Sequence, residues 1–489
     1  MSRQFLAYDL GADSGRAMLA RLTSGVIEVR EIHRFPTHTV TQNGSLRWDI
    51  ARIWHHIREA LDRVGDVPLE SIGVDTWGVD YGLLDGRGNL LGNPYHYRDS
   101  RTDGIMSAVF SRISRDRIYA VTGIQFLPIN TLFQLYAASR ATPADVETAR
   151  ALATIPDLLN YWLTGRLSSE YTIATTTQMV DARTRRWAEP LLEAIGLPTR
   201  LLQPIVEPGT TVGPLLDSVS ARFHGTPVVA PACHDTASAV AAVDTGSSGA
   251  FLSSGTWSLL GAELAAPVIT PDALALNFTN EGGVAGTTRL LKNITGLWLL
   301  QACRRCWSDE GRAVDYDALL EAMVADGQAF RSLVDPDHRD FVRPADMPRS
   351  IAAYCRRTGQ PEPDVPPAFA RTILESLAFK YRAVVESLES LIGSRVDTIR
   401  VVGGGARNRV LTQWTANATG RAVIAGPAEA TALGNVALQM VATGAVSSVA
   451  EARAAVERSF PVERFEPVDT ERWDDHYQRF RGYLEFSCA

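Results

Sequence analysis

Two apolar runs flank a short polar turn in the segment FLAYDLGADSGRAMLARL, residues 5–22. This arrangement is typical of a β-hairpin, in which a tight glycine-containing turn joins two strands. The segment AFLSSGTWSLLGAEL, residues 250–264, repeats the layout around a Ser-Gly-Thr turn. The sequence therefore predicts two related halves, each of which begins with a hairpin.

Strands and helices alternate through the rest of the chain. Residues 71–92 predict two strands separated by a polar turn. Apolar strands are also predicted at 227–233 and 397–402, and each is followed by a helical pattern. Further helices are predicted around 366–392 and 430–443. Such alternation indicates an α/β fold with mixed sheets.

The length of the chain predicts more than one domain. It has 489 residues, whereas chains longer than about 250–300 residues usually form more than one hydrophobic core. The small polar run DTGSSGA (244–250) is a candidate linker. We therefore predict two domains, residues 1–244 and residues 245–489.

Charge and hydropathy argue against several functional classes. The net charge is −7 and no long basic run occurs, which disfavours a broad nucleic-acid or anionic-membrane surface. The first apolar run is short and contains Asp9, so we expect no secretory signal. No stretch approaches the roughly 20 apolar residues that a membrane span needs. Five cysteines in so long a chain predict a reduced, cytoplasmic protein, and the pair Cys303 and Cys306 favours a structural helix.

The turn of the first hairpin, DLGADSGR (9–16), is a candidate phosphate-binding loop. Gly11 and Gly15 permit backbone conformations that other residues resist, and successive N–H groups of the turn can then face an anion. Asp9 is a candidate ligand for Mg²⁺, and Arg16 adds a positive charge. The alternative is a polar hairpin turn in which Asp9 is already hydrogen-bonded. The segment is not a P-loop, because it lacks the G-x-x-x-x-G-K-[ST] pattern.

Two further turns have the same character. Thr256, in SSGTWS (253–258), could donate its hydroxyl to a phosphate oxygen, although a plain hairpin turn explains it equally well. VVGGGARN (401–408) places three glycines between a buried strand and a helix, where N–H groups and the helix dipole favour an anion. Its spacing is not that of a dinucleotide fingerprint, and a tight strand-to-helix turn is the alternative.

Asp235, in HDTAS (234–238), is the candidate catalytic residue. It follows a predicted strand and opens a predicted helix, which is where function concentrates in open α/β sheets. A carboxylate there can orient a substrate hydroxyl and accept its proton while a phosphoryl group leaves ATP. The alternative is a helix N-cap, a role that Asp favours. His234 and Thr236 are candidate substrate ligands, and His234 could equally be a buried structural histidine.

Two segments carry polar groups among apolar residues, namely DTWGVD (75–80) and LKNITGLW (291–298). Gly78 would let a ligand approach the backbone, and Asn293 offers both a donor and an acceptor. The tryptophans of these segments could line a pocket, but burial in the core is the commoner position of large aromatic side chains.

Together these segments resemble the FGGY family of carbohydrate kinases, which belongs to the actin-like ATPase superfamily. The resemblance covers essentially the whole chain, and the runs around 74–101 and 123–132 resemble those of members that phosphorylate L-rhamnulose. It rests on an ordered series of segments: DLGADSGR (9–16), VDTWGVDYGLLD (74–85), YRDSR (97–101), GIQFLPINTL (123–132), SSEYTIATTTQ (168–178), CHDTASAV (233–240), LSSGTWSL (252–259), NEGG (280–283), LKNITGLWLLQ (291–301), VVGGGARN (401–408) and GPAEATALGN (426–435).

The resemblance implies two RNase H-like domains around a central cleft, with the sugar mainly on the N-terminal domain and ATP mainly on the C-terminal one. It implies phosphorylation of L-rhamnulose to L-rhamnulose 1-phosphate by ATP with Mg²⁺, and Asp235 as the general base. The implied sugar-binding residues are Gly78, His234, Asp235, Thr236 and Asn293. The implied ATP-binding residues are Ala12, Asp13, Ser14, Gly15, Arg16, Thr256, Gln301 and Gly404. Asp13 departs from the family pattern, which has Ser there.

Two other functions stay open. A kinase for L-fuculose, L-ribulose or glycerol would use the same chemistry with a different pocket. A nucleotide-driven chaperone or filament protein of the same superfamily would need no sugar base, and its ATP turnover would not depend on a sugar. The sequence predicts no nucleic-acid or membrane partner and gives no oligomeric state.

Overall fold

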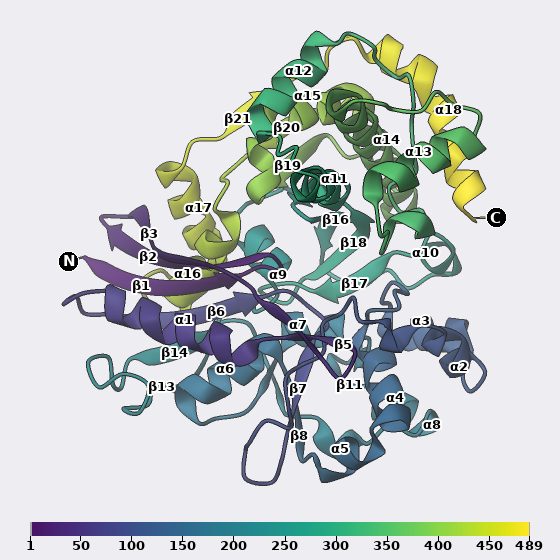
Figure 1. Ribbon diagram of the computed structural model, residues 1–489. Coiled ribbons are helices and arrows are strands. Elements are labelled where there is room, and N and C mark those ends of the chain that lie inside the picture. The colour runs from purple at the N-terminus through teal and green to yellow at the C-terminus, as the bar shows by residue number, and fades with distance from the viewer. Residues whose placement is uncertain (1, 489) are drawn as a thin grey trace. The chain divides into compact units, whose positions relative to one another are not determined.

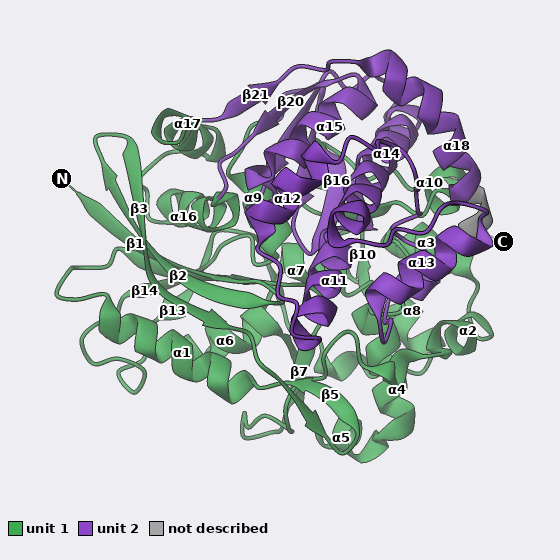
Figure 2. Cartoon of the chain, turned by 45° about the horizontal axis from the view of Figure 1, so that its top comes forward, with its two compact units in different colours: residues 1–244, 263–290, 429–461 green, residues 245–262, 291–428, 462–489 purple. Residues whose placement is uncertain are grey.

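The computed structural model describes residues 2–488, which form two compact units (Figure 2). Unit 1 comprises the residues up to 244 together with 263–290 and 429–461, and unit 2 comprises 245–262, 291–428 and the residues from 462 onward. The first boundary between the units follows residue 244, at the start of the predicted linker (244–250). The later segments 263–290 and 429–461 belong to unit 1 as well. The assignment of separate roles to residues 1–244 and 245–489 stays a prediction.

Unit 1 contains a six-stranded mixed sheet in the order β13-β14-β6-β1-β2-β3 (Figure 1). Its strands are β1 (Arg3–Leu10), β2 (Ser14–Thr23), β3 (Val26–Pro36), β6 (Ser71–Thr76), β13 (Thr210–Pro214) and β14 (Pro227–Ala230). β1 and β2 form the predicted hairpin. β1 pairs in parallel with β6, and β6 pairs in parallel with β14.

Helices cover both faces of this sheet (Figure 1). On one face α1 (Ile50–Arg63) and α6 (Ile155–Thr164) bury their apolar side chains against those of β1 and β6 in a single core. On the other face α16 (Ala430–Ala442) packs on the same two strands. A Cβ on Gly73 of β6 would collide there with the side chain of Asn435, so glycine lets the helix approach.

Unit 2 repeats this plan around the strands β18-β16-β15-β19-β20-β21, in that order. The strands are β15 (Gly249–Ser254), β16 (Trp257–Leu264), β18 (Thr288–Thr295), β19 (Thr398–Val402), β20 (Ala422–Ala425) and β21 (Glu463–Phe465). β15 and β16 form the second predicted hairpin, and β15, β19 and β20 pair in parallel. An antiparallel edge strand follows, as it does in unit 1. This shared plan confirms the prediction of two related halves.

Helices α14 (Pro366–Ile392), α15 (Arg409–Thr419) and α18 (Thr470–Cys488) pack together in unit 2. The C-terminal segment, whose position the sequence left open, therefore belongs to this unit. The helix α11 (Trp298–Asp309) carries Cys303 and Cys306, as predicted.

Shorter elements complete the two units. The strands are β4 (Thr39–Gln42), β5 (Ser45–Trp48), β7 (Tyr81–Leu84), β8 (Ala151–Thr154), β9 (Ser169–Glu170), β10 (Val180–Asp181), β11 (Arg186–Trp187), β12 (Ile205–Val206) and β17 (Thr279–Gly282). The helices are α2 (Ile105–Phe110), α3 (Arg115–Thr122), α4 (Thr131–Ala141), α5 (Pro143–Thr148), α7 (Tyr171–Thr176), α8 (Glu189–Ala194), α9 (Asp235–Ala241), α10 (Pro271–Ala275), α12 (Tyr316–Ala325), α13 (Met347–Arg357) and α17 (Val449–Ser459). None of the helices within residues 2–488 is both long enough and apolar enough to cross a membrane. The cytoplasmic location stays a prediction.

Candidate active site

The carboxyl ends of three neighbouring parallel strands lie at one edge of the sheet of unit 1. Asp9, near the end of β1, is the register partner of Asp75, near the end of β6. Thr76 ends β6 and bridges to His234, and Asp235 then opens α9. Because side chains alternate along a strand, the two register partners point to the face that α16 covers. This edge therefore gathers three carboxylates from distant parts of the chain.

Burial dominates the electrostatics of the first two carboxylates. Asp75 is 0% exposed and Asp9 is 6% exposed. Burial raises the pKa of Asp75 well above its usual range, and the nearby charge of Asp9 raises it further. Burial also raises the pKa of Asp9, although Arg16 opposes this. Oδ2 of Asp75 accepts a hydrogen bond from Asn435 (2.7 Å), whereas its buried Oδ1 has no partner among residues 2–488. Such an oxygen beside a second carboxylate suits a hard divalent cation.

Both sides of the Arg16 guanidinium are held by carboxylates. Its Nη2 donates to Oδ2 of Asp9 (2.5 Å), and its Nη1 donates to Oε2 of Glu429, which precedes α16. Burial lowers the pKa of Arg16, but the charges of Asp9 and Glu429 outweigh this and raise it overall. The positive charge that the sequence predicted is present, and unit 1 itself neutralises it.

The turn after β1 is closed by a hydrogen bond from the N–H of Gly11 to the carbonyl of Ser14 (2.9 Å). The glycines permit left-handed backbone conformations, but neither Gly11 nor Gly15 has φ in that region. Gly15 is required for space instead, because a Cβ there would lie 2.5 Å from the ring of Phe35. The predicted ATP-binding residues at the tip of this turn are partly or fully exposed: Ala12, Asp13 and Ser14.

Asp235 is the first residue of α9, and His234 takes the N-cap position without a capping side-chain bond. Oδ1 of Asp235 accepts hydrogen bonds from the backbone N–H (2.6 Å) and the hydroxyl (3.2 Å) of Thr236. Its Oδ2 accepts none from residues 2–488, and the side chain is 30% exposed. Burial raises the pKa of Asp235, and His234 opposes the rise. The carboxylate is therefore fixed through Oδ1, and Oδ2 stays available to a substrate hydroxyl. By accepting the N–H of Thr236, Asp235 also satisfies one backbone donor in the first turn of α9, which is part of the capping role that the sequence allowed.

His234 belongs to a buried charged network that sequence analysis did not identify. Its Nε2 lies 3.4 Å from Oδ1 of Asp235, and its Nδ1 lies 3.3 Å from Oε2 of Glu281. Arg289 is fully buried and donates from Nη2 to Glu281 (3.1 Å) and from Nε to a backbone carbonyl of β17 (2.9 Å). Glu281 lies in a segment that carried the family resemblance but suggested no role. The network fixes the imidazole ring beside Asp235.

Glu170 holds the backbone that leads into His234. Its Oε2 accepts hydrogen bonds from the N–H groups of Cys233 (3.0 Å) and Ile173 (3.1 Å), and its Oε1 accepts from the N–H of Thr172 (2.8 Å). The hydroxyl of Thr172 in turn accepts from the N–H of His234 (3.2 Å). Glu170 is fully buried, and burial raises its pKa to about 7. One side chain therefore caps α7 and positions the segment before α9.

Gly78 packs closely on α7, since a Cβ there would lie 3.2 Å from the side chain of Thr176. The next residue, Val79, has φ +67° and donates its N–H to the hydroxyl of Thr176 (3.1 Å). Trp77 is 5% exposed and donates from Nε1 to Asp80 (3.1 Å). The sequence allowed this tryptophan either to line a pocket or to lie in the core, and in the structure it lies in the core.

Unit 2 also presents strand ends at one edge, where Thr256 follows β15 and Gly404 follows β19. A Cβ on Gly405 would collide with Ser254, so the glycine run packs tightly on β15. A Cβ on Gly404 would meet nothing within 4 Å, which leaves the backbone there open to a ligand.

The turn of Thr256 is tied to the start of α11. Its carbonyl accepts hydrogen bonds from the N–H groups of Gly296 (3.2 Å) and Trp298 (3.1 Å). Gln301, one helical turn further along α11, has a buried Oε1 without a hydrogen-bond partner among residues 2–488. Asn293 lies on β18, which leads into this helix.

The predicted site residues fall into two groups by unit. Unit 1 holds Asp9, Ala12, Asp13, Ser14, Gly15, Arg16, Gly78, His234, Asp235 and Thr236. Unit 2 holds Thr256, Asn293, Gln301 and Gly404.

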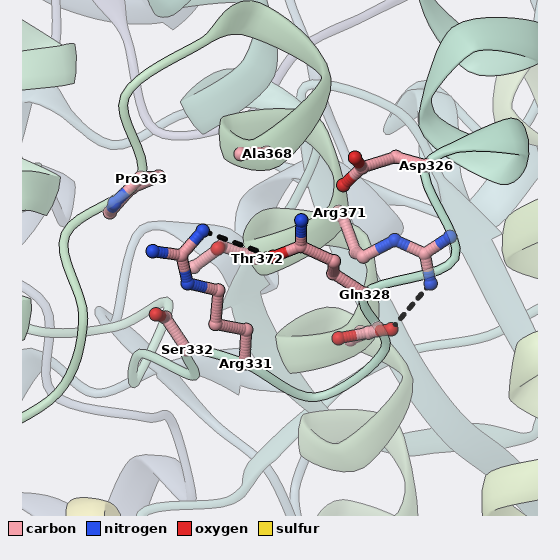
Figure 3. A pocket seen from close by; sticks show the side chains of 9 residues that line it. Asp326, Gln328, Arg331, Ser332, Pro363, Ala368, Arg371 and Thr372 are labelled. Carbon is pink, nitrogen blue, oxygen red and sulfur yellow. Dashed lines mark hydrogen bonds and ion pairs between the residues drawn. The ribbon is translucent and has the colours of Figure 1, made fainter.

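Two hollows lie outside these groups. A cavity of about 10 Å³ in unit 2 has room for at most one water molecule. Two hydrogen bonds join polar side chains that line it, Arg371 to Glu375 (3.0 Å) and Arg331 to Gln328 (3.1 Å) (Figure 3). A hollow of about 580 Å³ in unit 1 lies around Trp187 and contains none of the predicted site residues.

Comparison with known proteins identifies the family. Residues 4–242 match the N-terminal domain of the FGGY family of carbohydrate kinases, and residues 250–443 match its C-terminal domain. The chain belongs to this family. It is a carbohydrate kinase, an enzyme that transfers a phosphoryl group from ATP to a sugar.

Curated relatives are similar over nearly their whole length. A rhamnulokinase of Bacteroides thetaiotaomicron is 47% identical over 488 residues, which cover 99% of each chain. A rhamnulokinase of Pectobacterium carotovorum is 44% identical over 493 residues, covering 100% of this chain and 98% of the relative.

Solved structures share the fold. The gluconate kinase of Lactobacillus acidophilus superimposes with a TM-score of 0.79 at 17% identity, covering 99% of this chain and 98% of the other. The glycerol kinase of Plasmodium falciparum with ADP gives 0.78 at 16% identity, covering 100% and 98%. These similarities confirm the predicted α/β class with two RNase H-like domains of the actin-like ATPase type.

Proposed function

We propose that this kinase phosphorylates L-rhamnulose and releases L-rhamnulose 1-phosphate and ADP. The support is its similarity to rhamnulokinases, at 44–47% identity over 98% or more of each chain. The segments 74–101 and 123–132, whose sequences resemble this branch of the family, lie in unit 1 together with Asp235.

Asp235 is the proposed general base, and the geometry of its carboxylate carries the proposal. Oδ1 is fixed by the N–H of Thr236, while Oδ2 accepts no hydrogen bond from residues 2–488. A sugar hydroxyl at Oδ2 transfers its proton to the carboxylate as its oxygen bonds to the γ-phosphorus of ATP. The bond from that phosphorus to the bridging oxygen breaks, and ADP leaves. The raised pKa of Asp235 makes it a better proton acceptor, and the charges of His234 and Arg289 oppose the rise.

The other site residues are assigned by their surroundings. We propose that Gly78, His234, Thr236 and Asn293 contact the sugar, with the His234 ring held by Glu281. The open backbone at Gly404 supports its contact with ATP. The remaining residues proposed to contact ATP are Ala12, Asp13, Ser14, Gly15, Arg16, Thr256 and Gln301.

We also propose that the reaction uses Mg²⁺. Arg16 is neutralised by Asp9 and Glu429, so it leaves little net positive charge for a triphosphate. Asp9, assisted by the unpaired Oδ1 of Asp75, would hold the ion directly or through water. When bound, Mg²⁺ supplies positive charge to the phosphate oxygens.

The substrate is tested with purified protein, ATP and Mg²⁺ in a coupled ADP assay on L-rhamnulose, L-fuculose, L-ribulose and glycerol. We expect the highest kcat/KM for L-rhamnulose. A higher value for another sugar would replace the substrate and leave the kinase intact. Sugar-independent ATP turnover would favour the chaperone or filament branch of the superfamily.

The base is tested with Asp235→Asn in the same assay. The amide oxygen keeps the hydrogen bond from Thr236 but cannot accept the proton, so kcat should fall by about 10²–10⁴. KM and the unfolding midpoint should change little. The control is Asp116→Asn, the same exchange in the exposed first turn of α3. If Asp235→Asn retains more than about a tenth of the wild-type kcat, Asp235 is not the base.

A further inference from the structure

Two histidines and a glutamate lie together between β3 and α1, on residues that the kinase reaction does not use. His33 is a buried residue of β3, and α1 packs on this strand (Figure 1). His56 and Glu59 are three residues apart on α1, so they share one face of the helix. The helix and the strand therefore bring three metal-ligating side chains to one place.

The three facing atoms form a nearly regular triangle. Nε2 of His33 lies 3.1 Å from Nδ1 of His56 and 3.3 Å from Oε2 of Glu59. Nδ1 of His56 lies 3.3 Å from the same carboxylate oxygen. Zinc binds nitrogen and oxygen ligands at about 2.0–2.2 Å in a tetrahedron, which separates neighbouring ligands by roughly 3.4 Å. The triangle thus has nearly the dimensions of one face of a zinc tetrahedron.

No placement of protons on the two histidine nitrogens makes all three contacts of this triangle hydrogen bonds. The carboxylate oxygen of Glu59 only accepts hydrogen bonds, and each histidine nitrogen is either a donor or an acceptor. If both nitrogens carry protons, the 3.1 Å contact sets two donors against each other. If only one nitrogen carries a proton, the lone pair of the other nitrogen faces a lone pair of the Glu59 carboxylate oxygen at 3.3 Å. A cation at the centre attracts all three lone pairs and removes the conflict.

We propose that His33, His56 and Glu59 bind a divalent transition-metal ion of the Zn²⁺ class, with water as the fourth ligand. The two imidazoles favour zinc, nickel, cobalt or copper over magnesium, which prefers oxygen ligands. The side chains are 7%, 17% and 33% exposed in the order His33, His56, Glu59, so the two ligands on α1 are more accessible to solvent than the one on β3.

Neighbouring groups hold the ligands in place. The ring of Phe35 stacks on that of His56 at 4.6 Å and 16°. Arg63 donates to the second oxygen of Glu59 (2.5 Å) and leaves Oε2 to face the histidines. The Phe35 ring also packs on Gly15, so the ion would stabilise the base of the proposed phosphate-binding turn.

The test uses untagged full-length protein that has been stripped with a chelator, dialysed and titrated with Zn²⁺ in a calorimeter. We expect one Zn²⁺ per chain. His56→Gln and Glu59→Gln should each weaken binding by more than the about 10–100-fold that loss of an outer-sphere partner causes. The matched control is His55→Gln, an exposed histidine next to His56, which should bind as the wild type does. Co²⁺ in place of Zn²⁺ should give the strong visible absorption of a tetrahedral complex, and Mg²⁺ should not compete.

Thermal unfolding with and without Zn²⁺ gives an independent readout. Zinc should raise the midpoint of the wild type and of His55→Gln but not of His56→Gln or Glu59→Gln. Circular dichroism of the zinc-free variants checks that they fold. The proposal is overturned if the wild type binds no Zn²⁺ at millimolar concentration. Equal binding by wild type and His56→Gln, or equal loss in His55→Gln, overturns it too.

Discussion

Asp157, buried beside Glu170, predicts an unusual dependence of stability on pH. Its side chain is 2% exposed, and its oxygens accept from the hydroxyl of Thr154 (2.6 Å) and the N–H of Glu170 (3.1 Å). Burial raises the pKa of Asp157 to about 8 from the 3.8 of an exposed aspartate, and the charge of Glu170 adds to the shift. The folded chain therefore binds a proton here that the unfolded chain releases.

The sign and size of the effect follow from this difference. The contribution to stability is fully present below about pH 4 and is lost as the pH rises to about 8, at about 1.4 kcal/mol per pH unit. Asp157→Asn is neutral at every pH, and its amide can accept from Glu170 and donate to Thr154. The free energy of unfolding of the variant, relative to wild type, should therefore rise by about 4 kcal/mol between about pH 5 and pH 8.

Urea denaturation of both proteins across this pH range measures the difference. Asp145→Asn, the same exchange at an exposed position in α5, is the control. Activity of Asp157→Asn should stay within about tenfold of wild type, because Glu170 still holds Cys233. Parallel stability curves for wild type and Asp157→Asn would refute the argument, since they would mean that Asp157 binds no extra proton in the folded chain.

Two further predictions concern the site itself. Glu170→Gln keeps one oxygen for the N–H groups of Cys233 and Ile173 and should lose about 1.5–3 kcal/mol of unfolding free energy. Glu170→Ala leaves three buried N–H groups without an acceptor and should lose about 3–9 kcal/mol and most of kcat. Equal kinetics and stability for the two variants would contradict the positioning role. In the second prediction, exhaustive chelation should abolish phosphoryl transfer and added Mg²⁺ should restore it, and the Asp9→Asn variant should need more Mg²⁺ to reach its half-maximal rate. Full turnover without a divalent ion would remove the metal from the mechanism.

The sequence predicted those features that depend on local pattern. The hairpins at 5–22 and 250–264 and the long helix at 366–392 were recognisable because apolar periodicity and turn residues act over a few positions. Asp9 and Asp235 could be chosen as candidates for the same reason, since each stands where a predicted strand ends. The structure then brings these two residues to one edge of one sheet.

The partners of these residues could not be predicted in this way. Glu429 meets Arg16 across 413 positions of sequence, and Glu170 meets Cys233 across 63. Arg289 looks like any arginine of a strand until folding buries it against Glu281. Such contacts depend on which elements pack together, and a single sequence contains no local pattern for that. The packing of Gly15 could not be predicted for the same reason, because the ring of Phe35 that excludes a Cβ comes from another strand.

The two related halves carry different side chains on one backbone plan. In each, one strand of the hairpin pairs in parallel with a second strand, and the second strand pairs in parallel with a third. A helix follows the third strand at the same spacing, α9 after β14 and α16 after β20. The first residue of α9 is Asp235, whereas the first residue of α16 is Ala430. The edge of unit 1 where these strands end therefore presents the buried carboxylates of Asp9 and Asp75, which suit a cation, and the partly exposed carboxylate of Asp235. The corresponding edge of unit 2 presents Thr256 and the open backbone of Gly404, which lets a bulky ligand approach without charge repulsion. Since the parallel strand pairings are the same in both, the two edges differ in the side chains that they carry.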